Sequence, residues 1–524
     1  MNARTALALS LLAGALAACG DAGWYASGMP SGAYQDQAES PAPGDQDEAV
    51  GTNPFVATEH DPFSTFATDV DTASYDIFRR DLDQRGALPD PASVRLEEFV
   101  NAFDYAYPAP LAGAEHPFTL DLDAAPAPFA DTVIFRVGLH ARELPPAERP
   151  PANLVFLVDV SGSMSASNKL PLVKVVLREL VTTLRPTDRI AIVSYASGER
   201  VVLESTPVSQ SAAILHAIDR LDAGGSTAGQ AGLARAYSVA EGAFIEGGVN
   251  HVILCTDGDF NVGITSTDAL VAFIEAKRDG GVTLTALGFG YGNLNDAMME
   301  RVTNAGNGSY AVITDEDHAI QYAQQDLWRT IFIIARDTKL QVVFNPERVL
   351  AYRLLGYENR ALADDAFTDD RVDAGEVGAG HTVTALYELV LTGAAIPEAS
   401  GAPPLDDGGA WDGDPLALAP SALAEVRLRY KGADPHDPSP AHELRATFAA
   451  EDVRANWQAA ALDTRFATAV AAFAEILEQS PFAGRYDLGD LHAELTACAG
   501  DAADRLELRD HLGRARTVLT HGEL

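Results

Sequence analysis

The feature that most constrains the fold of this chain is an apolar run that ends in an aspartate and two serines. Residues 154–158 are all apolar, and Asp159, Ser161 and Ser163 follow at alternate positions. A β-branched run of this length, bounded by glycine and serine, predicts a buried strand with polar groups at its C-terminal end. Ligands bind at that end of the strands in open α/β sheets. Because the three side chains offer only oxygen, the ligand atom that Mg²⁺, Mn²⁺ and Ca²⁺ prefer, this turn is a candidate cation site.

Two later loops carry polar residues in matching positions. Thr227 lies in a glycine-rich loop, residues 224–229, directly before an apolar-periodic segment. Asp257 follows a second buried run, residues 251–256. Each loop alone is more typical of a helix cap than of a ligand. All three loops in this order favour a single metal site.

The three loops together resemble the metal-ion-dependent adhesion site of von Willebrand factor type A domains, whose first motif has the form D-x-S-x-S. The resemblance implies a divalent cation, Mg²⁺ in the first place with Mn²⁺ and Ca²⁺ left open, held by Asp159, Ser161, Ser163, Thr227 and Asp257. We expect the three hydroxyls to coordinate directly or nearly so. The two aspartates are expected to act through water or to switch with occupancy, and to orient the serines. The resemblance also implies that a carboxylate from a protein partner completes the coordination shell.

The segment around these loops alternates between strand and helix patterns, which predicts an α/β fold with a doubly wound, mostly parallel sheet of the von Willebrand A type. The expected strands are residues 153–159, 189–195, 200–204, 250–256, 281–288 and 308–313. Apolar residues at helical spacing predict a helix over 170–184, and a long amphipathic helix over 316–334 is expected to close the domain.

Strand patterns flank this α/β domain on both sides. They occupy residues 118–122 and 133–139 before it, and 339–344, 349–355, 382–391 and 424–430 after it. We expect these strands to pair into one β-sandwich-like domain into which the α/β domain is inserted, since the ends of a compact domain often lie close together. Two helices are expected on the N-terminal side, one from Ser74 through Leu82 and one from Pro91 or Ser93 through Phe103. Helices are also expected at 455–478 and 501–516 on the C-terminal side.

The first residues have the pattern of an export signal: Arg4, an apolar stretch over 6–16, and two alanines before Cys19. The apolar stretch is too short for a conventional membrane span. Residues 16–20 resemble a bacterial lipobox, which implies lipidation of Cys19 and an anchor in the cell envelope, at the outer membrane. An ordinary signal peptide with an incidental cysteine is the alternative. Residues 20–58 lack a sustained period and predict a flexible tether.

The predicted order of domains is signal peptide 1–19, tether 20–58, N-terminal region 59–150, A domain 152–336 and C-terminal region 337–524. Residues 62–75 and 95–101 resemble the region that precedes the A domain in a family of bacterial von Willebrand factor type A lipoproteins. Residues 355–360 and 380–388 resemble the C-terminal region of the same family. The resemblance implies an envelope lipoprotein and says little about its function.

Composition excludes one class of partner. The chain has 75 acidic and 37 basic residues and a formal net charge of −38, whereas nucleic-acid binding needs clustered lysines and arginines. We therefore expect no nucleic-acid partner. Two of its three cysteines, Cys255 and Cys498, fall in a buried strand and near the end of a predicted helix, so no disulfide framework is expected.

Catalytic motifs are missing from the sequence. His442-Glu443 lacks the second histidine of a zinc protease, and neither a Walker A sequence nor a dinucleotide fingerprint is present. We therefore expect a binding protein and not an enzyme. A metal-stabilised structural envelope protein stays open as an alternative, with the Asp-rich loop 405–414 as an internal plug of the site. Asp69 and Asp71 are open to two interpretations, a second cation site or, as favoured here, an exposed strand end before a helix.

Overall fold

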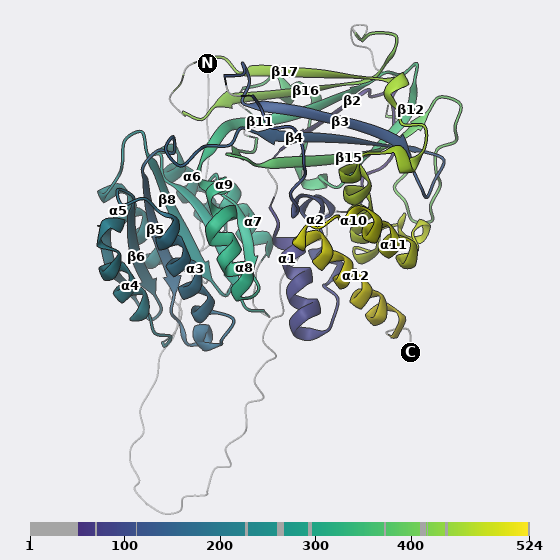
Figure 1. Cartoon of the computed structure of the whole chain (residues 1–524). Coiled ribbons are helices and arrows are strands. Elements are labelled where there is room, and N and C mark those ends of the chain that lie inside the picture. Colours follow the sequence, from purple (N-terminus) through teal and green to yellow (C-terminus); the bar gives the residue numbers. More distant parts are fainter. Residues whose placement is uncertain are drawn as a thin grey trace, which may run out of the picture. The chain divides into compact units, whose positions relative to one another are not determined.

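The described residues form three β-sheets with helices packed around them (Figure 1). The computed structural model describes residues 51–68, 71–111, 113–225, 229–258, 267–291, 296–370, 372, 374–408, 416, 418–434, 437 and 439–521. Every element below belongs to the unit that spans residues 43–524.

The α/β domain is built on a six-stranded sheet in the order β10-β9-β8-β5-β6-β7. All neighbouring strands in it are parallel except β7, which pairs antiparallel with β6. The strands are β5 (Ala152–Asp159), β6 (Arg189–Tyr195), β7 (Glu199–Pro207), β8 (Val249–Thr256), β9 (Thr283–Phe289) and β10 (Tyr310–Ile313). The prediction of a doubly wound, mostly parallel sheet is confirmed, and β5 lies in its interior.

Helices cover both faces of this sheet. Successive residues of a strand point to opposite faces, so Phe156 packs in the core on one face and Leu157 in the core on the other. The first core includes α3 (Leu170–Thr183), α4 (Ser211–Asp219), α8 (Glu316–Gln321) and α9 (Leu327–Ile331). The second includes α5 (Gly229–Gly242), α6 (Thr267–Asp279) and α7 (Asp296–Ala305). Burial on both faces explains the apolar runs 154–158 in β5 and 252–255 in β8.

The helix that closes the α/β domain is shorter than predicted. A π-helical turn over Tyr322–Asp326 joins α8 to α9, and the helical segment ends at Ile331 and not at residue 334. The next residues begin strand β11 at Ile333, which pairs with Gly378. A Cβ atom at Gly378 would lie 1.4 Å from the Arg329 carbonyl oxygen, so the end of α9 packs directly on the segment of Gly378 that pairs with β11. The apolar residues after Ile331, which the helical spacing assigned to the helix, pair in a β-sheet instead.

The other two sheets form the sandwich and are antiparallel throughout. One sheet has the order β1-β12-β15-β4-β3 and the other β13-β2-β11-β16-β17, with β14 on β11. Strands before the α/β domain are β1 (Val56–Ala57), β2 (Phe63–Ala67), β3 (Phe118–Pro126) and β4 (Val133–Ala141). Strands after it are β11 (Ile333–Phe344), β12 (Val349–Leu355), β13 (Ala361–Leu362), β14 (Val377–Gly378), β15 (Thr382–Leu391), β16 (Ala422–Gly432) and β17 (His442–Ala449).

The ladders confirm that the α/β domain is inserted into the sandwich. Strand β4 pairs with β15 over eight residues, and β2 pairs with β11. Aromatic contacts join the two sheets: Phe135 lies 5.4 Å from Phe448 and Phe344 lies 5.2 Å from Tyr387, measured between ring centroids. The other face of the first sheet is covered by α1 (Ala73–Arg80), α2 (Leu96–Asn101), α10 (Leu462–Leu477), α11 (Leu488–Cys498) and α12 (Ala503–His521).

The ordered part of the chain begins earlier than the predicted end of the tether at residue 58. Val56 and Ala57 pair with β12, and the side-chain amide of Asn53 donates to the backbone carbonyls of Leu354, near the end of that strand, and Gly356, just after it. Phe55 is buried against Phe482. Their partners are some 300 residues away in sequence, so local composition did not indicate them. Residues 1–50, Cys19 among them, lie outside the described residues.

Two further findings concern the described part of the chain. Cys255 and Cys498 are buried and free, and Cys255 lies in a buried strand, as predicted. None of the helices in the described ranges combines the length and the apolar character needed to cross a bilayer.

Candidate metal centre

The candidate metal centre lies at the C-terminal end of β5, which lies between β6 and β8 in the sheet. Asp159 is the last residue of β5 and is fully buried. One of its carboxylate oxygens, Oδ1, accepts the backbone N–H of Ser161 at 2.7 Å, and this bond folds the chain into a tight turn. The hydroxyls of Ser161 and Ser163 lie 2.9 Å apart. Asp159 and Ser161 are buried whereas Ser163 is exposed, so the turn opens to solvent at Ser163.

The glycine-rich loop lies beside this turn. Gly224 donates to the carbonyl of Val160 at 2.7 Å, and Gly162 donates to the carbonyl of Gly225 at 3.0 Å. Gly225 has a φ of +96°, and a Cβ atom there would lie 2.6 Å from the Ser197 hydroxyl, so only glycine fits this close approach. The structure therefore brings the first two predicted loops together. Thr227 itself lies outside the described residues, and its role stays a prediction.

Asp257 enters the site from β8, the other strand next to β5. It follows the strand directly and is 1% exposed. Its Oδ1 atom and the Oδ2 atom of Asp159 are buried, and neither accepts a well-formed hydrogen bond from any residue in the described ranges. A buried carboxylate oxygen without a partner is costly, so this pair of oxygens points to a missing positive group.

The electrostatics agree with that interpretation. Burial, followed by the nearby carboxylate of Asp257, raises the pKa of Asp159 to about 6, although hydrogen bonds from Ser161 oppose the shift. Two carboxylates in one partly dehydrated place disfavour each other's charge. A divalent cation would relieve this repulsion, and all the donors at hand are oxygens, which suit a hard ion such as Mg²⁺. Asp159, Ser161, Ser163 and Asp257 therefore fit the predicted metal centre.

One residue at this site was missed by the sequence reasoning. The ammonium group of Lys169 donates to Oδ2 of Asp257 at 2.8 Å. Lys169 immediately precedes α3, where a lysine is usually taken for a solvated side chain. Its sequence signal is weak: the lysine falls within ten residues of the aspartate and serines of the first motif.

The described part of the Asp-rich loop 405–414 contacts strand β1. The backbone of Asp406 is paired with that strand, through hydrogen bonds with Phe55 and Ala57. Residues 409–414 of the loop lie outside the described residues, so the plug stays a prediction.

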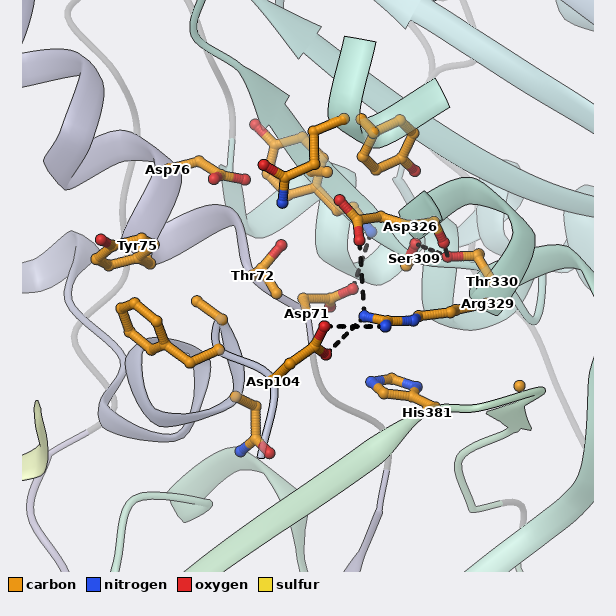
Figure 2. Close-up of a pocket in the computed structure, with 18 of the residues that line it drawn as sticks. Asp71, Thr72, Tyr75, Asp76, Asp104, Ser309, Asp326, Arg329, Thr330 and His381 are labelled. Carbon is orange, nitrogen blue, oxygen red and sulfur yellow. Dashed lines mark hydrogen bonds and ion pairs between the residues drawn. The ribbon is translucent and has the colours of Figure 1, made fainter. Parts of the chain in front are cut away.

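A second polar place is the cavity of about 170 Å³ drawn in Figure 2, which lies where α1, β10, α9 and the start of β15 meet. Figure 2 shows Arg329 between Asp104 and Asp326, with His381 beside it. Arg329 forms a two-pronged ion pair with Asp104 at 2.7 and 3.0 Å. Burial lowers the pKa of His381 to about 4, so this histidine is neutral near pH 7. The arginine and its two carboxylates bind one another, which indicates a structural contact.

Asp71, one of the two aspartates proposed above as an exposed strand end, is in fact buried. It accepts the backbone N–H of Tyr310 at 2.8 Å and pairs with Arg360 at 3.2 Å, because the chain here is covered by the α/β domain. With Glu98 and Glu300 it forms a group of carboxylates close enough to share an ion. Asp69 lies outside the described residues.

Family models match three consecutive parts of the chain. They are described as "von Willebrand factor" for residues 43–135, "von Willebrand factor type A domain" for 153–326 and "Uncharacterized protein YfbK, C-terminal" for 329–514. The chain therefore contains a von Willebrand factor type A domain, here called the A domain, followed by a C-terminal region of the YfbK type. The resemblance inferred from the sequence is confirmed for these three regions.

Individual proteins and a solved structure are similar to parts of this chain. YfbK of Escherichia coli is 43% identical over 347 residues, which cover 65% of this chain and 60% of YfbK. The protein sll0103 of Synechocystis sp. is 29% identical over 217 residues, 41% of this chain and 50% of that protein. This chain thus matches well under two thirds of the length of either relative. A solved von Willebrand factor type A protein from Catenulispora acidiphila is 18% identical with a TM-score of 0.42, over 74% of this chain and 88% of the other.

Proposed function

We propose that the A domain binds one divalent cation, Mg²⁺ in the first place, at the C-terminal end of β5. Ser161, Ser163 and Thr227 supply hydroxyl ligands, and Asp159 and Asp257 supply negative charge directly or through water. The observation that carries the proposal is the pair of buried aspartate oxygens, Oδ2 of Asp159 and Oδ1 of Asp257, that meet no cationic group and accept no well-formed hydrogen bond among the described residues. Cation binding supplies the positive charge that these oxygens lack.

The same site is proposed to bind a protein partner through a carboxylate of that partner. Ser163 is exposed, so the shell of a cation held here faces solvent on one side. Mg²⁺ retains water ligands and exchanges them for incoming oxygen atoms. The chain has a net charge of −38, and the site without a cation repels acidic groups. Binding of a carboxylate is therefore expected to depend strictly on the metal.

The experiment is affinity capture from bacterial envelope extracts with immobilised protein. Three samples are compared: wild type with Mg²⁺, wild type with EDTA, and Asp159→Ala with Mg²⁺. The proposal predicts a protein that is retained only in the first sample and is eluted by EDTA. Retention of the same proteins in all three samples would contradict it.

We also propose that the protein is anchored in the bacterial cell envelope, at the outer membrane, by a lipid on Cys19. The support is the sequence alone, an export pattern that ends in a lipobox-like stretch. In cell fractionation, Cys19→Ser is expected to move the protein from the membrane fraction to the soluble fraction. An unchanged distribution would refute the anchor.

A further inference from the structure

The ammonium group of Lys169 lies at the metal centre although nothing in the D-x-S-x-S pattern requires a lysine there. Its Nζ atom donates to Oδ2 of Asp257 at 2.8 Å. The Lys169 side chain is only 11% exposed, and the Asp257 side chain is fully buried. An ion pair of this kind is much less screened by water than a pair on the surface.

The path of the Lys169 side chain is fixed by its surroundings. Its methylene groups lie over Gly290, the residue after β9, where a Cβ atom would come within 2.4 Å of Lys169 Cε. Gly290 has a φ of +81°, a conformation that favours glycine. On the other side, the backbone of Lys169 accepts the N–H of Val173 in the first turn of α3. The lysine is thus held between a helix start and a glycine, with its charged end on the aspartate.

Placing both the lysine and a divalent cation on these carboxylates is electrostatically unfavourable. Asp159 and Asp257 offer two negative charges, and Lys169 already neutralises one of them. A protonated lysine has three donors and no acceptor, so it cannot be a metal ligand. It repels a divalent cation placed on the same carboxylates.

We propose that Lys169 is an internal counter-ion of the metal-free site and competes with the cation for Asp257. Metal binding then includes breaking the ion pair between Lys169 and Asp257. The lysine lowers the metal affinity of the site and stabilises the A domain when no metal is bound. This inference rests on the proposed cation binding.

The opposite role makes the opposite prediction. If Lys169 positions Asp257 for the metal, its removal weakens metal binding because the carboxylate loses its orientation. If Lys169 competes, its removal strengthens metal binding, since the carboxylate is free and the repulsion is gone. The sign of the change in affinity therefore distinguishes the two roles.

The experiment is calorimetric titration of Mg²⁺ into the purified protein as wild type, Lys169→Met and Lys174→Met. Lys174 is the matched control. It lies within α3, the helix that Lys169 precedes, and its ammonium group donates to the backbone carbonyl of Asp219, away from the centre. A charge-assisted hydrogen bond of this kind corresponds to about a tenfold change in binding. We expect Lys169→Met to bind Mg²⁺ about tenfold more tightly than wild type and Lys174→Met to bind as wild type does. Thermal unfolding without metal should start at a lower temperature in Lys169→Met, and Mg²⁺ should restore it.

The other outcomes are equally informative. If wild type binds Mg²⁺ and Lys169→Met binds it equally or more weakly, competition is refuted while the metal centre stands. If only Lys169→Met binds, competition is strong enough to close the wild-type site. If neither binds, both the metal centre and the competition are refuted. Metal-dependent thermal stabilisation, measured on the same samples, shows whether a variant that does not bind is still folded.

Discussion

Two groups of buried carboxylates in this chain have opposite surroundings. The first is the metal centre with Asp159 and Asp257, and the second is the set of Asp71, Glu98 and Glu300, which we call the closed cluster. In both groups, acidic residues from several elements lie together and are buried. They differ in what faces the carboxylates.

In the closed cluster the facing groups are arginines and backbone amides. Arg95 pairs with Glu300 at 3.1 Å, and Arg360 lies 3.2 Å from both Asp71 and Glu300. Glu98 accepts the backbone N–H of Ser74 at 2.8 Å. In the candidate metal centre, by contrast, the described groups that face the two aspartates are one lysine, the turn of Ser161 and the hydroxyl of Tyr195. Oδ2 of Asp159 and Oδ1 of Asp257 accept no well-formed hydrogen bond from them.

The comparison teaches that acidic residue count does not identify a metal site. A carboxylate that meets guanidinium groups and backbone N–H groups has its charge compensated within the chain. The closed cluster therefore holds the N-terminal helices on the A domain. Unpaired buried oxygens, and not proximity of carboxylates alone, indicate where a cation is needed.

The largest expected effect is the loss of an arginine from the closed cluster. Arg95→Met removes the guanidinium that faces Glu98 and Glu300 and leaves their charges buried without it. Breaking a buried ion pair on one side costs about 3–5 kcal/mol of unfolding free energy. Urea unfolding measures this loss, and Mg²⁺ titration of the folded variant should give wild-type affinity. A loss below about 1 kcal/mol would show that the cluster does not hold the N-terminal helices, and weakened Mg²⁺ binding would show that the two groups are not independent.

A smaller effect is expected at Asp76, a buried carboxyl in the cavity of Figure 2. Burial raises its pKa from 3.8 to about 8, and the nearby His318 is neutral because burial lowers its pKa to about 3. Asp76 thus shows a third solution, in which the proton itself compensates the charge. Between pH 4 and pH 8 the folded state holds a proton that the unfolded state has lost, so this group makes stability fall as pH rises through that window.

Asp76→Asn should remove this part of the pH dependence. The amide still offers an oxygen to the N–H of Val312, which now donates to Asp76 at 3.3 Å. We expect the unfolding free energy at pH 8 to rise by on the order of 2 kcal/mol relative to wild type, and that at pH 4 to change little. Urea unfolding at both pH values measures it, with Asp317→Asn as the control because Asp317 is exposed on α8. The same pH dependence in wild type and Asp76→Asn would contradict a protonated Asp76.

The sequence predicted which residues meet at the candidate metal centre better than it predicted their surroundings. Asp159, Ser161, Ser163 and Asp257 were predictable because they follow continuous apolar strands, and parallel strands deliver such residues to one edge of a sheet. Lys169 was not predictable, because the sequence around a lysine before a helix does not show whether its side chain is buried in a contact or solvated.

Long-range pairing explains the other differences. Phe55 and strand β1 lie in a stretch whose composition predicts a tether, and only their partners on β12 and at Phe482 order them. Asp71 was expected at an exposed strand end because the residue that pairs with it, Arg360, is nearly 300 positions away and leaves no signal in the local sequence. The closing helix ends early because Ile333 is drawn into a ladder with β14. Local sequence does not contain these contacts.

The measurement that tests the central claim most directly is calorimetric titration of Mg²⁺, Mn²⁺ and Ca²⁺ into wild type and Asp159→Ala. The account predicts that wild type binds one ion and that Asp159→Ala, still folded by circular dichroism, binds none. If both proteins bind the ion with the same affinity, or if wild type, Asp159→Ala and Lys169→Met all fail to bind, the carboxylates at the end of β5 do not hold a cation and the proposed function is refuted.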